Sequence, residues 1–500
     1  MNLITDPWIP VRTRAGRRTI RPAEVVDRDV IAVDFPRPDM TGATVEFLIG
    51  LLSTAGLAAD EAAWAAGWRD RPTAHQLDTT LAPHVPAWSV QTAMQTPSQW
   101  TPQPIEGLFL DAPGDNTEKL GKDFLRRSQD LALSPGAALA ATMALQMYTG
   151  AAGRCESGAY LPVSLRGGGP LTTLVVGGDD LWGQVWPNVE TVEQMRSRGV
   201  GSYGQGLANV YPWLADQSDA VTPDGTHPAY VYWAMPRSVQ LLWGEGGVCS
   251  LTGQKADTLV REIRLDCGAK ATGFTHPLSP YREVNGQWLP VLSPKERIGY
   301  RDWLGFVTLD ENRRPALAVS HVRAHRYTLR DARVVACGAV LSKAQYETWS
   351  EGVAPLWSAD RDTRDVLDAT ARALVSGARQ AVKMLRAALK DGRSPPSSGR
   401  FWIMTEAPFW AAMAAAGRVA RDDADDATFS IRIDWLLTIR KAALAIFDGA
   451  LPLDADHAGR LGQIVQARHR LAVGLKGYGK TGKALCAALG VPEPTEVNGE

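Results

Sequence analysis

The feature that most restricts the fold is a run of apolar residues at helical spacing in the C-terminal part of the chain. The segment RDVLDATARALVSGARQAVKMLRAALKDG has apolar side chains at steps of three and four residues, namely Leu367, Ala371, Leu374, Ala378, Val382 and Leu385. This spacing places one apolar stripe on a long amphipathic helix. The sequence therefore predicts a helix whose stripe is covered by neighbouring elements.

The residues that follow provide those neighbours. DGRSPPSSGR ends the first helix, and further helical patterns cover roughly 401–419, 428–448 and 455–490. Four helices joined by short connections are typical of an antiparallel bundle. We therefore expect residues 357–500 to form a C-terminal antiparallel four-helix bundle.

The first 356 residues have a different pattern. A hairpin is expected around the turn Arg14–Arg17, a helical pattern covers 41–68, and Pro135–Tyr148 is predicted to be a helix. Between about 80 and 355, β-like runs such as Leu171–Val176 and Tyr230–Ala234 are separated by many Pro and Gly residues. Because 500 residues exceed one compact core, we predict an α+β protein. Its large, irregular, mixed α/β N-terminal domain (1–356) precedes the C-terminal four-helix bundle.

Composition excludes several classes of protein. The net charge is −1, so any affinity for nucleic acid must come from local basic patches. The scattered cysteines include no C-x-x-C pair, which argues against a disulfide scaffold and a structural zinc site; they are Cys155, Cys249, Cys267, Cys337 and Cys486. No stretch has ~20 uninterrupted apolar residues, and the N-terminus lacks the apolar core of a signal peptide. We expect a cytoplasmic protein in a reducing compartment, with no cofactor, no metal and no membrane contact.

One short motif points to nucleotide chemistry. Gly474–Thr481 fits G-x-x-x-x-G-K-[ST], the phosphate loop of nucleoside triphosphatases. A working phosphate loop lies between a buried strand and a helix, whereas Leu461–Val473 has a helical pattern and 19 residues follow Thr481. We interpret the motif as the basic end of the last bundle helix, with a P-loop ATPase as the alternative function.

Two loops of the N-terminal domain have features suited to nucleic acid. In GKDFLRRSQD (121–130), Lys122, Arg126 and Arg127 flank Phe124, a mixture suited to phosphate contact plus an apolar anchor. The alternative is a helix start with Phe124 in the core. The stretch 150–169 contains six glycines with Arg154 and Arg166, so its backbone can approach another surface closely. A structural turn cluster is the alternative there.

A third segment is strongly basic. Residues 313–333 hold six arginines and two histidines, and their alternation predicts a strand with one polar face that meets phosphates or solvent. In the next segment, Gly338 is predicted to mark a turn and Leu341–Tyr346 an exposed loop. The eight histidines form no H-E-x-x-H pattern and no nucleophile elbow is present. The sequence therefore offers no convincing catalytic set.

The chain resembles the CasA family, the large subunits of the type I-E CRISPR surveillance complex (Cascade). The resemblance rests on MNLITDPWIPVR with FPRPDM (35–40), on SLRGGGPLTTLV (164–175) and on THPLSPYRE (275–283) after CSLTGQK. These motifs follow the order of the family, as does the layout of an α/β domain before a helical bundle.

The resemblance implies a non-enzymatic DNA-binding subunit. Members of the family read the protospacer-adjacent motif, a short tag beside the target, in double-stranded DNA and mostly from the minor groove. They assist duplex opening and recruit an effector helicase-nuclease. The implied partners are other Cascade subunits, the guide RNA, target DNA and that nuclease.

The resemblance also assigns residues. The family's glycine loop matches 150–158, with Gly150, Gly153, Arg154 and Gly158. Its strand-separating wedge loop matches Ser342, Lys343 and Ala344, where Lys343 replaces a glutamine. An ungapped match places Asp266 at the lysine of the family's basic finger, so Arg264 and Lys270 are the neighbouring candidates. The motif-sensing loop matches the segment with Lys122, Phe124, Arg126 and Arg127.

Overall fold

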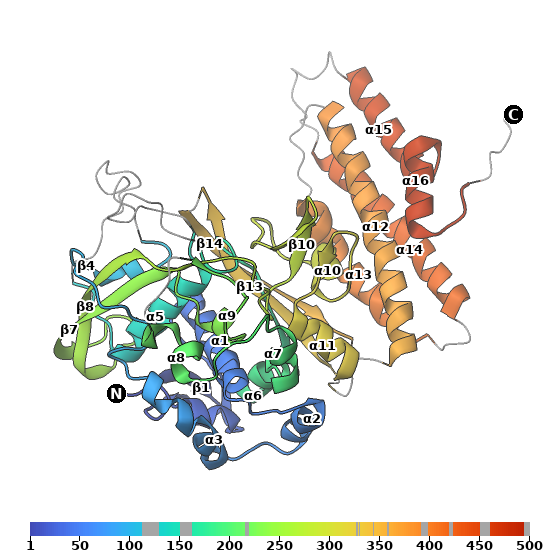
Figure 1. Cartoon of the computed structure of the whole chain (residues 1–500). Coiled ribbons are helices and arrows are strands. Elements are labelled where there is room, and N and C mark those ends of the chain that lie inside the picture. Colours follow the sequence, from blue (N-terminus) through green and yellow to red (C-terminus); the bar gives the residue numbers. More distant parts are fainter. Residues whose placement is uncertain are drawn as a thin grey trace, which may run out of the picture. The chain divides into compact units, whose positions relative to one another are not determined.

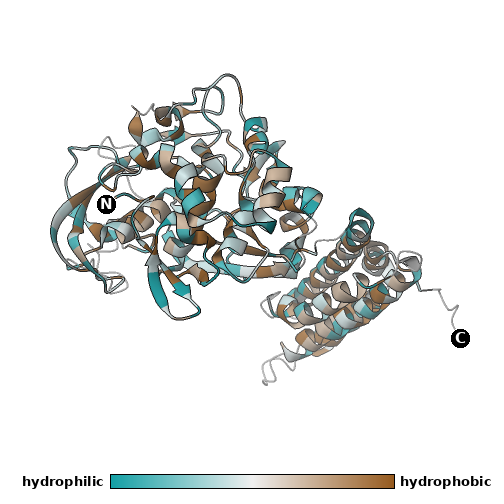
Figure 2. Ribbon diagram, turned by 90° about the horizontal axis from the view of Figure 1, so that it is seen from below, coloured by the Kyte–Doolittle hydropathy of each residue, from teal (hydrophilic) through white to brown (hydrophobic). Residues whose placement is uncertain are grey.

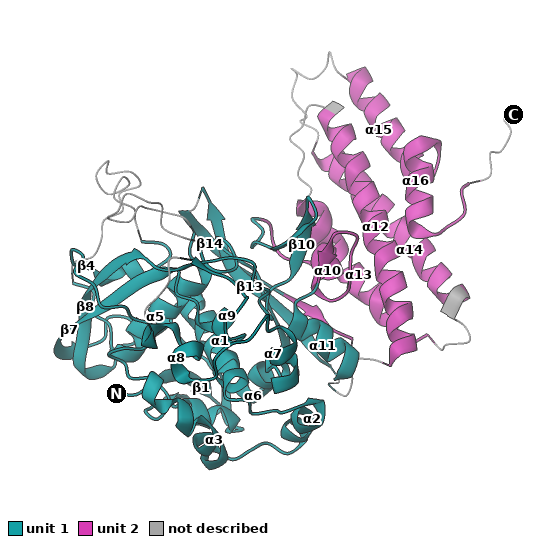
Figure 3. Ribbon diagram, viewed as in Figure 1, with its two compact units in different colours: residues 1–295, 315–352 teal, residues 296–314, 353–500 magenta. Residues whose placement is uncertain are grey.

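The computed structural model describes most of the chain, in two compact units. The described residues are 1–112, 130–150, 163–215, 220–326, 329, 331–343, 345–357, 360–391, 399–419, 424–450 and 461–494. The first unit comprises 1–295 with 315–352, and the second comprises 296–314 with 353–500 (Figure 3). The division into domains 1–356 and 357–500 remains a prediction.

The first unit begins with the predicted hairpin. Strands β1 (Ile9–Thr13) and β2 (Arg17–Ile20) pair antiparallel, and β3 (Val30–Val33) pairs with the other edge of β1. Gly16 at the turn has a φ of 147°, which a residue with a side chain rarely adopts. The hairpin prediction is confirmed.

Two helices form the centre of this unit. Helix α1 (Pro38–Thr54) packs against α5 (Pro135–Tyr148), and both are buried on nearly all sides (Figure 1). The helix predicted at 135–148 is confirmed, whereas the pattern over 41–68 is two helices, α1 and α2 (Glu61–Arg69). The break follows from local chemistry, because Gly56 has a φ of 66° and Asp60 caps α2 by accepting a hydrogen bond from the Ala63 amide at 2.8 Å.

Two sheets lie beside these helices. The first has the order β14–β13–β5, made of β5 (Thr172–Val176), β13 (Arg333–Ser342) and β14 (Gln345–Pro355). The second is a long hairpin of β7 (Arg237–Val248) and β8 (Lys255–Cys267), to which β4 (Gln103–Pro104) adds. The strand predicted at 171–176 is therefore confirmed.

The remaining elements of the first unit are short. They are the helices α3 (Ala74–Leu81), α6 (Leu181–Val185), α7 (Val192–Ser197), α8 (Leu207–Val210), α9 (Tyr230–Trp233) and α11 (Leu317–His325), and the strands β6 (Ala220–Val221), β9 (Lys270–Ala271), β10 (Tyr281–Val284) and β11 (Gln287–Pro290).

Three predictions in this unit are wrong. Residues 230–233 form helix α9 with all four side chains buried, and a fully buried apolar run does not distinguish a strand from a helix. Residues 317–325 form helix α11, whose buried side chains at Ala318, Val319 and Val322 follow a helical period. Gly338 lies inside β13 and not in a turn. A side chain there would collide with the Pro170 carbonyl and the Ser293 hydroxyl, which explains the glycine.

The second unit is helical, as predicted. Its main helices are α12 (Arg361–Asp391), α13 (Gly399–Ala416), α14 (Ala424–Gly449), α15 (Leu461–Leu475) and α16 (Gly479–Leu489). Figure 2 shows that these helices carry both hydrophobic and hydrophilic residues. The predicted stripe of α12 is buried at Leu367, Ala371 and Leu374. Helix α12 contacts α14, α15 and α16.

The prediction of four helices needs one correction. The pattern over 455–490 contains two helices, because Gly477 and Gly479 have φ values of 100° and 71° and turn the chain between α15 and α16. The segment 296–314 adds α10 (Trp303–Phe306) and β12 (Arg313–Arg314) to this unit. Its Tyr300 stacks on Phe409 at 4.3 Å between ring centroids, which fixes the segment on α13.

Candidate nucleic-acid interface

The first candidate site residue lies directly after helix α5. Gly150 is buried, and its carbonyl accepts a 2.6 Å hydrogen bond from Nη2 of Arg237 at the start of β7. The same Nη2 donates to Thr149 Oγ1 at 3.0 Å. Arg237 is itself buried, which lowers its pKa to about 10. The point where the glycine-rich stretch leaves α5 is therefore anchored to the β7–β8 hairpin; Gly153, Arg154 and Gly158 lie outside the described residues.

The stretch ends in three consecutive glycines that lie against Gly150 and β13. A Cβ atom on Gly168 would lie 3.2 Å from Gly150 Cα and 3.5 Å from Leu341 Cδ1. A Cβ atom on Gly169 would lie 2.5 Å from the Ala339 carbonyl oxygen, and Gly169 has a φ of 67°. Gly150, at the start of the first candidate loop, and Leu341, next to the wedge residues, therefore both pack against the glycine backbone.

The candidate wedge residues lie at the β13–β14 hairpin. Ser342 ends β13, and Lys343 is exposed with a left-handed φ of 49°; Ala344 lies outside the described residues. Lys295 Nζ donates to Ser342 Oγ at 2.9 Å and to Glu347 Oε1 at 2.8 Å. The hydrogen bonds from Lys295 and then Ser342 lower the pKa of Glu347. Lys295 thus ties the two strands together below the exposed Lys343.

The two candidates for the basic finger differ in their exposure and in their hydrogen-bond partners. Arg264 on β8 is half-buried, and its Nη1 donates to the Ser98 carbonyl at 3.1 Å and to Gln240 Oε1 at 3.0 Å. Lys270 on β9 is exposed, and its strand pairs in parallel with β6. Asp266, at the ungapped family position, is buried. Of these three residues, Lys270 is the one placed to reach a phosphate.

Arg166 does not serve as a surface charge. It is buried with Glu46 of α1, at exposed side-chain fractions of 3% and 1%, and its Nη2 lies 2.9 Å from Glu46 Oε2. Glu46 Oε1 also accepts hydrogen bonds from Tyr148 and Thr172, each at 2.7 Å. Burial, and then the Glu46 carboxylate, raise the pKa of Tyr148 well above its usual value. The expected contribution of Arg166 to a basic loop is wrong, and its charge stabilises the core instead.

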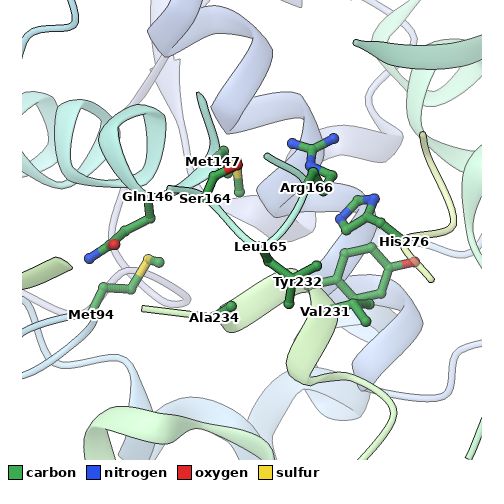
Figure 4. A pocket seen from close by; sticks show the side chains of 10 residues that line it. All are labelled: Met94, Gln146, Met147, Ser164, Leu165, Arg166, Val231, Tyr232, Ala234 and His276. Atoms are coloured by element: carbon green, nitrogen blue, oxygen red, sulfur yellow. The ribbon is translucent and has the colours of Figure 1, made fainter. Parts of the chain in front are cut away.

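A small pocket lies behind this pair. Figure 4 shows Arg166 beside His276 on one side and Gln146 with Met94 on the other; the remaining lining residues are Met147, Ser164, Leu165, Val231, Tyr232 and Ala234. Burial, and then the charges of Arg166 and Arg198, lower the pKa of His276 well below its usual value. His276 Nδ1 accepts from the Leu278 amide at 3.2 Å, so the neutral ring carries its proton on Nε2. These contacts belong to the polar core.

Two arginines of the basic segment 313–333 are also directed into the protein. Arg323 and Arg326 are buried on and after helix α11. Arg326 Nε lies 2.9 Å from Glu61 Oε2, and its guanidinium lies 4.0 Å from the ring centre of Trp64. The expected strand with a basic face is therefore replaced by a helix that anchors α2.

The loop with Lys122, Phe124, Arg126 and Arg127 lies outside the described residues, so its proposed role stays a prediction. The phosphate-loop motif is described. Gly474–Thr481 joins α15 to α16, and the helical pattern expected before it is confirmed. This helix–turn–helix differs from the strand–loop–helix that a nucleoside triphosphatase requires. Lys480 is exposed in α16, and Lys483 pairs with Glu493 at 3.1 Å.

The described residues offer no candidate for a metal site. Within the described residues, no group of three or more His, Cys, Asp or Glu side chains is arranged to hold a metal ion. No helix of those residues is long and apolar enough to cross a membrane. Cys249, Cys337 and Cys486 are free and buried. Cys267 at the end of β8 is disulfide-bonded, a bond that the sequence did not indicate.

Two residues near the candidate site were missed from the sequence. Arg237 anchors Gly150, and Lys295 braces the β13–β14 hairpin. Their partners lie 87 and 47 positions away, so no local motif signals either contact.

Comparisons with known proteins identify the family. The family model described as CRISPR-associated protein Cse1 matches residues 2–446. Thermobifida fusca Cse1 has a TM-score of 0.71 and 16% identity over 98% of both chains. Thermus thermophilus CasA has a TM-score of 0.68 and 17% identity, covering 94% of this chain and 99% of that one.

One matched structure comes from an assembly. A chain of a structure titled CRISPR RNA-guided surveillance complex has a TM-score of 0.62 and 15% identity, covering 95% of this chain and 99% of that chain. At such identities, structural likeness shows the fold alone. Comparison with curated proteins gave no match. The family model, which spans most of the sequence, shows that this chain belongs to the CRISPR-associated Cse1 family.

Proposed function

We propose that this chain is the large subunit of a type I-E Cascade complex and recognises the protospacer-adjacent motif in double-stranded DNA. The observation that supports this proposal is the junction at Gly168, where Gly150 meets the strand that leads to Lys343. The start of the glycine-rich stretch therefore lies beside the strand that leads to the exposed Lys343. A motif-reading loop next to a strand-separating loop needs this arrangement.

The readout is from the minor groove. That groove distinguishes A·T from G·C pairs but presents few other differences, so a backbone contact tolerates several related tags. Lys343 and Lys270 supply the charges that meet phosphates. A lysine side chain donates hydrogen bonds but cannot accept them, whereas the family's glutamine can do both. Lys343 therefore contacts a phosphate.

Duplex opening follows from the hairpin. Unstacking a base step costs a few kcal/mol, which new contacts to the separated strands must offset. Lys295 and Glu347 stiffen the hairpin below Lys343, so that the tip can push between strands without folding back. The protein acts without chemistry of its own, and its opening of the DNA lets guide RNA pair with the target strand.

The remaining parts of the proposal concern partners. We assign contacts with other Cascade subunits and the guide RNA, and the recruitment of an effector helicase-nuclease, to the family role. The loop with Phe124 acts as the motif-sensing contact. The site of action is the cytoplasm.

Binding measurements test this function. The chain is assembled with the guide RNA and the other subunits, and its affinity is measured for duplexes that differ only in the adjacent tag. We expect tag-dependent binding that Lys343→Ala weakens by about threefold to tenfold, while the slope of log K against log salt decreases by about 1.

The matched control is Lys255→Ala, an exposed lysine at the opposite end of β8 from Cys267, which should leave affinity and slope unchanged. Binding that is indifferent to the tag, or a chain that never joins the complex, would contradict the proposal. Unchanged binding by both Lys343→Ala and Lys270→Ala would contradict the site assignment.

A further inference from the structure

The three glycines at 167–169 lie between the two parts of the candidate interface. Their packing supports the function proposed above, because their backbone contacts both parts. We propose that Gly168 and Gly169 are positioning residues. They fix the spacing between Gly150 and the β13–β14 hairpin, so that engagement of DNA at the glycine stretch aligns the wedge with the first target base pair. This inference rests on the proposed function.

The first support is the closeness of Gly168 to both parts. A Cβ atom at 168 would lie 3.2 Å from Gly150 Cα, a tight contact that is relieved only if the Gly150 backbone moves. On the other side, Leu341 of β13 packs against the same backbone, with Cδ1 3.5 Å from that position. An alanine at 168 would therefore displace Gly150 by a few tenths of an ångström, while its methyl group would meet Leu341 at an ordinary contact distance.

The second support is the way Gly169 is bound. Its amide donates to the Tyr148 carbonyl at 3.2 Å, and its carbonyl accepts from the Ser293 amide at 2.9 Å. These bonds join it to the end of α5 and to the segment that leads to Lys295. Its left-handed φ and the nearby Ala339 carbonyl require a glycine.

The third support is that both sides of the junction are immobilised. On the α5 side, buried Arg237 holds the Gly150 carbonyl, and Arg166 next to the glycines is held by Glu46. On the β13 side, Gly338 packs closely against Pro170, which directly follows the glycines. Well-packed contacts of this kind transmit a displacement rather than absorb it.

The most informative substitution is Gly168→Ala. No left-handed φ is required at this position, so the change adds one methyl group and shifts Gly150 slightly. Gly244→Ala in β7 is the matched control, because its methyl group would lie 3.7 Å from the nearest atom, the Leu259 carbonyl oxygen, at an ordinary contact distance.

Two DNA substrates separate positioning from stability. One is a closed duplex with the tag, and the other is the same duplex with mismatches that open it beside the tag. Opening is followed with a fluorescent base analogue at the first target positions. If the packed junction couples the two sites, the complex with Gly168→Ala should open the closed duplex about five- to thirtyfold more slowly than the unsubstituted complex. Binding to the pre-opened duplex should stay within about twofold of the unsubstituted complex, and Gly244→Ala should match that complex on both substrates.

Each other outcome overturns the inference. Equal losses on both duplexes would assign the glycines to fold stability alone. If Gly168→Ala does not assemble, Leu341→Ala is the second variant, because it removes the β13 side of the contact. It should then show the same selective slowing of duplex opening. Failure of both variants to assemble, or normal duplex opening by the Gly168→Ala complex, would contradict the positioning role of the glycines. Either result would leave the proposal of tag recognition intact. Tag-independent binding by the unsubstituted complex would remove the proposed function and the junction together.

Discussion

The buried pair of Arg166 and Glu46 allows a quantitative prediction. Replacing Arg166 with Met leaves the Glu46 carboxylate in the core with hydrogen bonds from Tyr148 and Thr172 but without its cation. Breaking a buried pair by removing one partner costs about 3–5 kcal/mol, because the remaining charge is desolvated and uncompensated. We expect Arg166→Met to lower the free energy of unfolding by that amount.

The second substitution isolates the charge. In Glu46→Gln combined with Arg166→Met, the amide oxygen can still accept from Tyr148 and Thr172, and no uncompensated charge remains. The loss should then be about 1–2 kcal/mol, since neutral replacements of a buried pair are tolerated far better. The double variant is thus expected to be more stable than Arg166→Met alone.

Urea unfolding followed by tryptophan fluorescence and circular dichroism measures these differences. Because two compact units can unfold separately, the transition that changes with the Arg166 substitution is the one to analyse. The exposed control Lys255→Met should remain within about 0.5 kcal/mol of the original chain. Arg166→Met with stability equal to this control, or a double variant less stable than the single one, would refute the reasoning.

Three further predictions concern His276, Gly377 and Lys480. The native pKa of His276 lies well below its usual value, so the unfolded chain binds its proton first as pH falls below about 6.5. Urea midpoints should therefore decrease from pH 7 to pH 5, and His276→Asn should reduce that decrease. Gly377→Ala should destabilise the second unit by about 1–3 kcal/mol in thermal melts, because its methyl group would collide with Leu489, whereas an unchanged melt would contradict this packing. Phosphate release from ATP should be the same for the original chain and Lys480→Ala. ATP turnover that disappears in Lys480→Ala would instead support the alternative function, a P-loop ATPase.

Periodic elements were the ones predictable from the sequence. The stripe of α12 and the largely apolar α5 carry their signal within one segment, and both helices are confirmed. The buried run at 230–233 carried no period that separates strand from helix, and its helix was missed. In the phosphate-loop motif, Gly477 and Gly479 signalled a turn between helices rather than nucleotide chemistry.

The chemistry of charged residues was harder to predict because it depends on distant partners. Arg166 lies beside flexible-looking glycines in the sequence, yet its charge is neutralised by a residue 120 positions away. Arg326 belongs to a conspicuous basic run but is held by Glu61. Lys343 is exposed, but the loop expected at Leu341–Tyr346 is wrong in extent, because Leu341 and Ser342 end β13 and Gln345 and Tyr346 begin β14. Its role, and those of the other candidate site residues, stays a prediction.

A structure of the assembled complex with a tag-containing duplex bound tests the central claim most directly. The account predicts that the Gly150 segment faces the minor groove of the tag, with Lys343 within hydrogen-bond distance of a phosphate where the strands separate. DNA that instead follows the α15–α16 turn at Lys476 and Lys480, with the β13–β14 hairpin free of DNA, would contradict it.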